Sequence, residues 1–149
     1  MTQIGQLADE VKISQAITLT AGAAGTSTIA GSIIDMAGYD GVLVVVQFGA
    51  ITAGAVTSIK MQQDTVVAFT AAADLLGTGQ TIADTADDTV FYIDLKRPLE
   101  QFVRLFVSRA TQSAVVSAVY YQYRGRTKPA VQPAGVTGEK WISPIEGTA

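Results

Sequence analysis

Acidic side chains are concentrated in one short stretch of the chain, residues 84–88, with the sequence Asp-Thr-Ala-Asp-Asp. Calcium takes about six to eight oxygen ligands, and carboxylates at this spacing could supply several of them. The stretch lacks the regularly spaced acidic positions and the closing glutamate of a calcium-binding loop. We therefore interpret it as a solvated turn between strands and predict no bound metal. Asp84, Asp87 and Asp88 are also candidates for receiving a basic segment of a partner or of a second copy.

Few other residues could carry a reaction. The chain contains no histidine and no cysteine, which removes the commonest general base, thiolate nucleophiles and disulfides. Two carboxylates can hydrolyse a glycoside, but nothing in the sequence sets the separation that this reaction needs. Gly77 and Gly79 form a G-x-G without a third glycine or a following Lys-Ser/Thr pair, so no phosphate loop is predicted. We expect no catalytic residue, no cofactor and no enzymatic activity.

A basic run lies further along the chain, where Arg124, Arg126 and Lys128 alternate with small residues. Such a run could contact phosphates, and the tyrosines within 120–123 could stack on bases. However, the sequence pI is about 4.7 and the formal net charge is −3, and alternation along a strand directs some of these tyrosines into a core or an interface. We predict no nucleic-acid partner.

The charge is divided by position along the chain. Residues 1–95 carry two basic and ten acidic side chains, a net of −8, whereas residues 96–149 carry eight basic and three acidic ones, a net of +5. Charge asymmetry of this kind concerns partners rather than fold. Charged residues make up only 15% of the chain, below the usual value of about 25%. We therefore expect neighbouring molecules to cover part of the surface, and an acidic body with a basic end to favour assembly.

The dominant secondary-structure signal is β. Valine, isoleucine, threonine and aromatic residues form short runs separated by glycine and aspartate, and only residues 4–11 show a weak helical pattern. We expect the runs 42–48 and 55–63 to form a hairpin. About eight short strands at turn-sized spacing predict an all-β fold, an antiparallel β-sandwich and specifically a jelly roll. The predicted strands are 13–20, 26–35, 42–48, 55–63, 66–70, 80–83, 89–95, 102–109 and 115–124.

The chain is expected to have three parts: an N-terminal segment 1–12, a sandwich domain 13–124 and an extended C-terminal arm 125–149. Glycine and proline recur throughout the arm and prevent it from forming the regular hydrogen bonds of a β-sheet. Ordering it costs about 1–2 kcal/mol per residue in backbone entropy, so only a docking surface would hold it. The arm contains Lys140 and Trp141, the only tryptophan. We predict that it docks on a neighbour, the alternative being a free terminus.

Two long uncharged stretches, 13–34 and 41–59, resemble membrane spans in length but contain polar residues and glycines. We read both as strand–turn–strand and predict no membrane partner. The first residues lack the basic and apolar regions of a signal peptide, so secretion by that route is not expected.

Several segments resemble small virion proteins of tailed bacteriophages, and most of all the head decoration, or cement, proteins. The resemblance covers the chain from about residue 13 to its end. It implies a jelly-roll body, a homotrimer and a position over the major capsid protein at the capsid surface of the virion, after synthesis in the host cytoplasm. It implies no catalytic residues. The segments are 35–42 (DMAGYDGV), 80–85 (QTIADT), 91–95 (FYIDL) followed by Arg97-Pro98, 102–105 (FVRL) and 143–149 (SPIEGTA).

The sequence therefore predicts a structural protein that stabilises a phage head by binding the capsid lattice as an oligomer. The predicted partner-binding residues fall in the basic end, the arm and the acidic stretch. Tail, neck and fibre proteins of this size share sandwich folds, so another phage component is an alternative. A carbohydrate- or receptor-binding sandwich is another. The predicted residues are Arg124, Arg126, Lys128, Lys140, Trp141, Asp84, Asp87 and Asp88.

Overall fold

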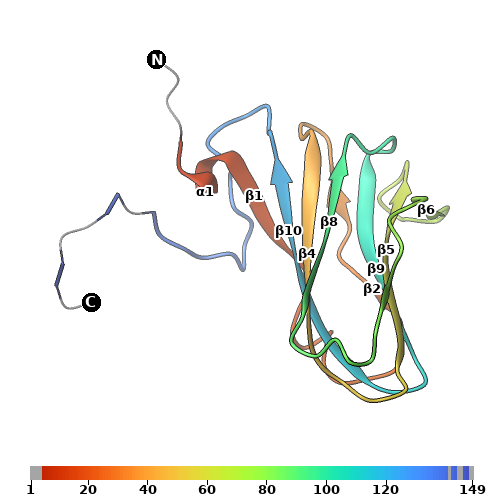
Figure 1. Ribbon diagram of the computed structural model, residues 1–149. Helices are drawn as coiled ribbons and strands as arrows, with labels where there is room; N and C mark the ends of the chain where they lie inside the picture. The colour runs from red at the N-terminus through yellow and green to blue at the C-terminus, as the bar shows by residue number, and fades with distance from the viewer. Residues whose placement is uncertain (1–4, 141, 144–145, 148–149) are drawn as a thin grey trace.

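The computed structural model describes residues 5–140, 142–143 and 146–147, and it is an antiparallel β-sandwich (Figure 1). Two sheets pack face to face, and the one helix among the described residues, α1 (Leu7–Glu10), has four residues. The predicted all-β class and two-sheet architecture are therefore confirmed. The helical pattern at 4–11 yields only α1, because the chain turns into a strand at Val11.

The first sheet is organised around β4 and is called the β4 sheet. It has four strands in the order β1-β10-β4-β8, all antiparallel. Its edge strands are therefore β1 and β8. Their bounds are β1 (Val11–Ile17), β10 (Ala114–Tyr123), β4 (Gly41–Ile51) and β8 (Val90–Lys96).

The second sheet, the β5 sheet, is built on the central pair β5 and β9. Two very short strands follow one another along the outer edge of β9, and two more follow one another along the outer edge of β5. The strands are β5 (Val56–Asp64), β9 (Phe102–Ala110), β2 (Ile29–Ala30) and β3 (Ile34–Asp35) beside β9, and β6 (Ala73–Asp74) and β7 (Gln80–Ile82) beside β5.

The core lies between the sheets and follows the alternation of the strands. Every second residue of β10, of β9 from Val103 to Arg109 and of β4 from Val42 to Phe48 points inward and is buried, as strand geometry requires. The alternation of β4 is interrupted after Phe48, where the register with β10 shifts and Ile51 is the next buried residue.

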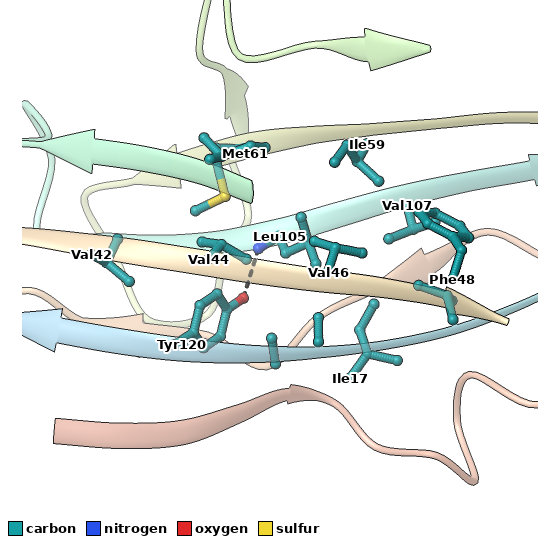
Figure 2. Packing of buried hydrophobic residues seen from close by; sticks show 14 of the residues in the cluster. Ile17, Val42, Val44, Val46, Phe48, Ile59, Met61, Leu105, Val107 and Tyr120 are labelled. Carbon is teal, nitrogen blue, oxygen red and sulfur yellow. Dashed lines mark hydrogen bonds between the residues drawn. The ribbon is translucent and has the colours of Figure 1, made fainter. Parts of the chain in front are cut away.

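Figure 2 shows Tyr120 reaching across this core, where its hydroxyl accepts a hydrogen bond from the Leu105 amide at 2.7 Å. The same hydroxyl donates to the Ser32 carbonyl at 2.9 Å. One side chain thus ties β10 to the opposite sheet.

The predicted hairpin between 42–48 and 55–63 is wrong. Both runs are strands, but β4 pairs with β10 and β8 whereas β5 pairs with β9 and lies in the other sheet. Alternation identifies the buried face of a strand, but it carries no information on which strand lies beside it.

Two predicted strands are also corrected. Residues 26–35 form two short strands, β2 and β3, instead of one. Between them the Gly31 amide donates to the Leu105 carbonyl of β9, and the Ser32 amide donates to the Ala16 carbonyl of β1 in the other sheet. Residues 66–70 form turns, because the Asp64 carboxylate accepts hydrogen bonds from the amides of Val66 and Ala71 and folds the chain back.

Candidate interaction surface

The acidic stretch 84–88 serves the fold at one end of the sandwich. Asp87 Oδ1 accepts a hydrogen bond from the Ile51 amide at 2.7 Å, and Asp84 Oδ2 accepts one from the Gly54 amide at 2.6 Å. These bonds hold the turn that carries the chain from β4 to β5. Asp88 is exposed and adopts a positive φ of 52°. Among the described residues, no group of three or more acidic side chains is placed to hold a metal ion.

The basic residues Arg124 and Arg126 lie at the opposite end of the sandwich. β10 ends at Tyr123, which pairs with Gly41 at the start of β4, while the acidic stretch lies beside Ile51 at the end of β4. At about 3.3 Å per residue, the 11 residues of β4 separate the two ends by roughly 33 Å. Within one chain, the structure therefore does not bring Arg124 or Arg126 to the acidic stretch.

The two lysines of the arm find acidic partners elsewhere, in the N-terminal segment. Lys140 Nζ lies 2.7 Å from Asp9 Oδ1, and Lys128 Nζ pairs with Glu10 Oε2. All four side chains are partly exposed, so each pair contributes at most about 1 kcal/mol. Figure 1 shows the arm running away from the sandwich beside α1 and β1. The structure thus brings the arm together with residues that the sequence did not single out.

Gln132 fixes the arm to the open edge of β1. Its Nε2 donates to the carbonyl of Val11 at 2.8 Å and to that of Ala8 at 3.0 Å, and its Oε1 accepts from the Ile13 amide at 2.8 Å. The side-chain amide therefore pairs with the edge as another strand's peptide group would. The Ala130 amide adds a bond to the Asp9 carbonyl at 2.8 Å.

The role of Gln132 was missed from the sequence, because a lone glutamine in a polar segment gives no signal of its own. The only hint is that prolines flank this segment. Pro129 and Pro133 have no backbone N–H to donate, so a side-chain amide is the donor that can pair with a strand edge there.

A cavity of about 520 Å³ lies between the arm and the N-terminal segment. Ala8, Ile13, Gln132, Val136 and Lys140 are among its lining residues. Trp141, which was predicted to bind a partner, lies outside the residues that the structure describes.

The outer face of the β5 sheet carries a cluster of paired polar side chains beside Phe102 and Phe106. Lys60 Nζ lies 2.6 Å from Asp74 Oδ2, and Gln62 bridges Asp74 to the Arg104 side chain. The hydrogen bonds from Lys60 and Gln62 lower the pKa of Asp74. The Arg104 guanidinium also stacks on Phe69, 4.3 Å from the ring centroid.

The outer face of the β4 sheet is apolar by contrast. The register places Tyr92, Val45 and Val119 side by side on three adjacent strands, with Leu43 and Tyr121 in the next row. These side chains are exposed or half-buried.

The one carboxylate of that next row, Asp94, is already bonded. Tyr123 Oη donates to Asp94 Oδ1 at 2.7 Å. Desolvation, together with this bond, raises the pKa of Tyr123 to about 12. The side-chain bond between Tyr123 and Asp94 thus pairs the carboxylate that lies on this face.

No protein-family model and no curated protein sequence matches this chain. Among the described residues, the single helix is far too short to cross a membrane.

Proposed function

We propose that this protein is a capsid decoration, or cement, protein of a tailed bacteriophage, which binds the major capsid protein at the surface of the head as an oligomer and stabilises the shell. It acts by binding and has no enzymatic activity. The proposal rests on the resemblance of its segments to such proteins and on the shape of the chain: a small sandwich with an extended arm.

The single observation that carries the proposal is the arrangement of the arm. Residues 126–140 run outside the sandwich and are held through Gln132, Lys128 and Lys140 to a short N-terminal segment rather than to the core. Most of the arm's side chains are exposed, and Val131 is 80% exposed. An extended element with one side fastened and one side open is suited to lie along another protein.

The strand order supports assigning the sandwich to the jelly-roll type. From β4 onward, successive long strands lie in opposite sheets, with β4, β8 and β10 in one and β5 and β9 in the other. Between β1 and β4, which share a sheet, the chain crosses to the other sheet and forms β2 and β3 beside β9. If the tandem pairs β2–β3 and β6–β7 are each counted as one position, each sheet has four positions. Eight positions joined by such crossings are typical of a jelly roll.

Binding to empty heads tests the proposal. The full chain is mixed with empty heads assembled from the major capsid protein encoded with it, and the pelleted fraction is measured. We expect saturable binding that weakens in Val131→Glu, because a charge then replaces an apolar contact on the open side of the arm. Val67→Glu is the matched control, since Val67 is also exposed, at 63%, but lies in the turn after β5. Absence of binding by the unsubstituted chain would refute the capsid role, and equal weakening by both variants would refute the role of the arm.

A further inference from the structure

The two sheets differ in the side chains that they present on their outer faces. The polar groups of the β5 sheet bond to one another, and the turn after β5 places Phe69 against Arg104 on that face. The β4 sheet instead presents eight apolar or aromatic side chains outward from β4, β8 and β10, beside the polar Gln47, Asp94, Lys96 and Ser117. The eight are Leu43, Val45, Val90, Tyr92, Val115, Val119, Tyr121 and Tyr123.

The arm is held at β1, one edge strand of the β4 sheet, where Ile13 of the outer face lines the cavity formed with the arm. Its hydrogen bonds go to residues 8–13 at the edge of β1 and to Gly38 at the end of the sheet. Tyr92, on the far edge strand β8, is 67% exposed. The face of β10, β4 and β8 is thus a mainly apolar surface of exposed and half-buried side chains.

The ends of the same sheet carry opposite charge. Lys96, Arg97 and Arg124 are exposed at the end where β4 begins, where they outnumber the two carboxylates Asp40 and Asp94. Asp84, Asp87 and Asp88 lie at the end where β4 finishes. The basic side chain of Arg109 lies near that end too, but it is buried and donates to the carbonyls of Ser27, Ala23 and Ala114.

We propose that the outer face of the β4 sheet packs against the same face of a second copy, with the strands antiparallel, about a two-fold axis that passes near Val45 and Val119. This orientation sets the basic end of each copy against the acidic end of the other, so the attraction occurs twice. The parallel orientation would instead set like charges together at both ends. Charge complementarity therefore favours a second copy of this chain as the partner, and it favours the antiparallel orientation of the strands.

The size of the face predicts a modest affinity. Three strands about 4.8 Å apart, β10, β4 and β8, extend along the roughly 33 Å of β4 and define a footprint of roughly 400–500 Å². A standard interface buries about 800 Å² on each partner, so the charged ends must supply the remainder. We expect a dissociation constant on the order of micromolar.

Sedimentation equilibrium of the full chain tests this contact. Over concentrations from about 1 to about 300 µM, which bracket a micromolar equilibrium, the mass should rise from that of one chain to that of two. Tyr92→Lys should raise the dissociation constant at least about tenfold, and Val45→Lys should do the same. Leu76→Lys is the control, because Leu76 is 99% exposed in a loop beyond β6 and should leave the equilibrium unchanged. Tyr92 is exposed, so its variant tests the contact even if Val45→Lys fails to fold.

Spin labels test the orientation, because the chain has no native cysteine to interfere. In the antiparallel arrangement, labels at Gln47→Cys near the axis should give a short distance between copies, whereas labels at Lys96→Cys should give a long one. The parallel arrangement would give a short distance at both positions and would overturn the proposed direction.

A single-chain mass at all concentrations or an unchanged equilibrium in folded Tyr92→Lys would each overturn the two-fold contact. A three-chain mass would overturn it too, and would instead support the homotrimer that the resemblance to decoration proteins implies. The contact does not depend on the capsid role. A chain that binds heads but stays monomeric refutes this inference alone, and a dimer that ignores heads refutes the proposed function alone.

Discussion

Gln132 Oε1 accepts a hydrogen bond from the amide of Ile13 at 2.8 Å, which joins two residues 119 positions apart. This bond fastens the C-terminal arm to the open edge of β1, next to the N-terminal segment. The two ends of the chain therefore form one unit outside the sandwich, and the arm is ordered without entering the core.

Replacement of Gln132 by alanine should free the arm and leave the sandwich intact. The substitution removes the side chain's three bonds to Ala8, Val11 and Ile13, none of which involves the core. Hydrogen exchange should show faster exchange at the Ile13 amide, by at least about tenfold if the loss is about 1.4 kcal/mol. Gln112→Ala, in the exposed turn between β9 and β10, is the control. Unchanged protection at Ile13 would contradict this account of the arm.

Removing the two N-terminal charges should loosen the arm's far end. In the double variant Asp9→Asn, Glu10→Gln, Lys140 and Lys128 lose their ion pairs, each worth up to about 1 kcal/mol. Trypsin should then cut after Lys140 a few times faster than in the unsubstituted chain. The same acceleration should appear at high salt, because salt screens exposed pairs. Asp88→Asn, at the far end of the sandwich, should leave the rate unchanged, and an equal rate in the double variant would count against the ion pairs.

The acidic stretch should stabilise the fold without metal. Asp87→Ala leaves the Ile51 amide without its side-chain acceptor, which should lower the free energy of unfolding by about 1–2 kcal/mol. Calorimetry should show a lower Tm for this variant, and neither calcium nor a chelator should shift the Tm of the unsubstituted chain. A Tm that falls by several degrees on chelation would show that these carboxylates hold an ion.

Alkaline pH should destabilise the sandwich through Tyr123. Burial and the bond to Asp94 raise the pKa of this phenol from 10.0 to about 12, so the folded state keeps its proton longer than the unfolded state does. The stabilisation is complete below about pH 10 and declines as the pH rises towards about 12. Urea unfolding across this range should show a smaller decline in Tyr123→Phe than in the unsubstituted chain. An identical pH dependence in the two proteins would contradict the assignment.

Alternation of apolar residues in a sequence marks the buried face of a strand but not the strands that lie beside it. The inward positions Val103, Leu105 and Val107 in β9, and Ile93 in β8, are buried as the alternation predicts, because alternation is a local property of one strand. Which strands pair is decided by burial across the whole chain. Consequently, β4 and β5 are neighbours in sequence but lie in different sheets.

The candidate site shows the same division. Composition and charge identified a basic arm and an acidic stretch, but not that the arm's lysines would bond to Asp9 and Glu10. The carboxylates at 84–88 bond to backbone amides of the β4–β5 turn, whose position depends on how the two sheets pack. Hydrogen bonds between a side chain and a backbone group far away in the sequence produce no periodic pattern of residues, so the sequence alone does not reveal them.

A cryo-electron microscopy map of empty phage heads mixed with this protein tests the central claim most directly. We predict density for the sandwich on the outside of the shell at symmetry-related positions, with the arm of each copy lying along the capsid surface or a neighbouring copy. Heads that remain bare at saturating protein concentration would contradict the claim that this chain acts by binding the capsid.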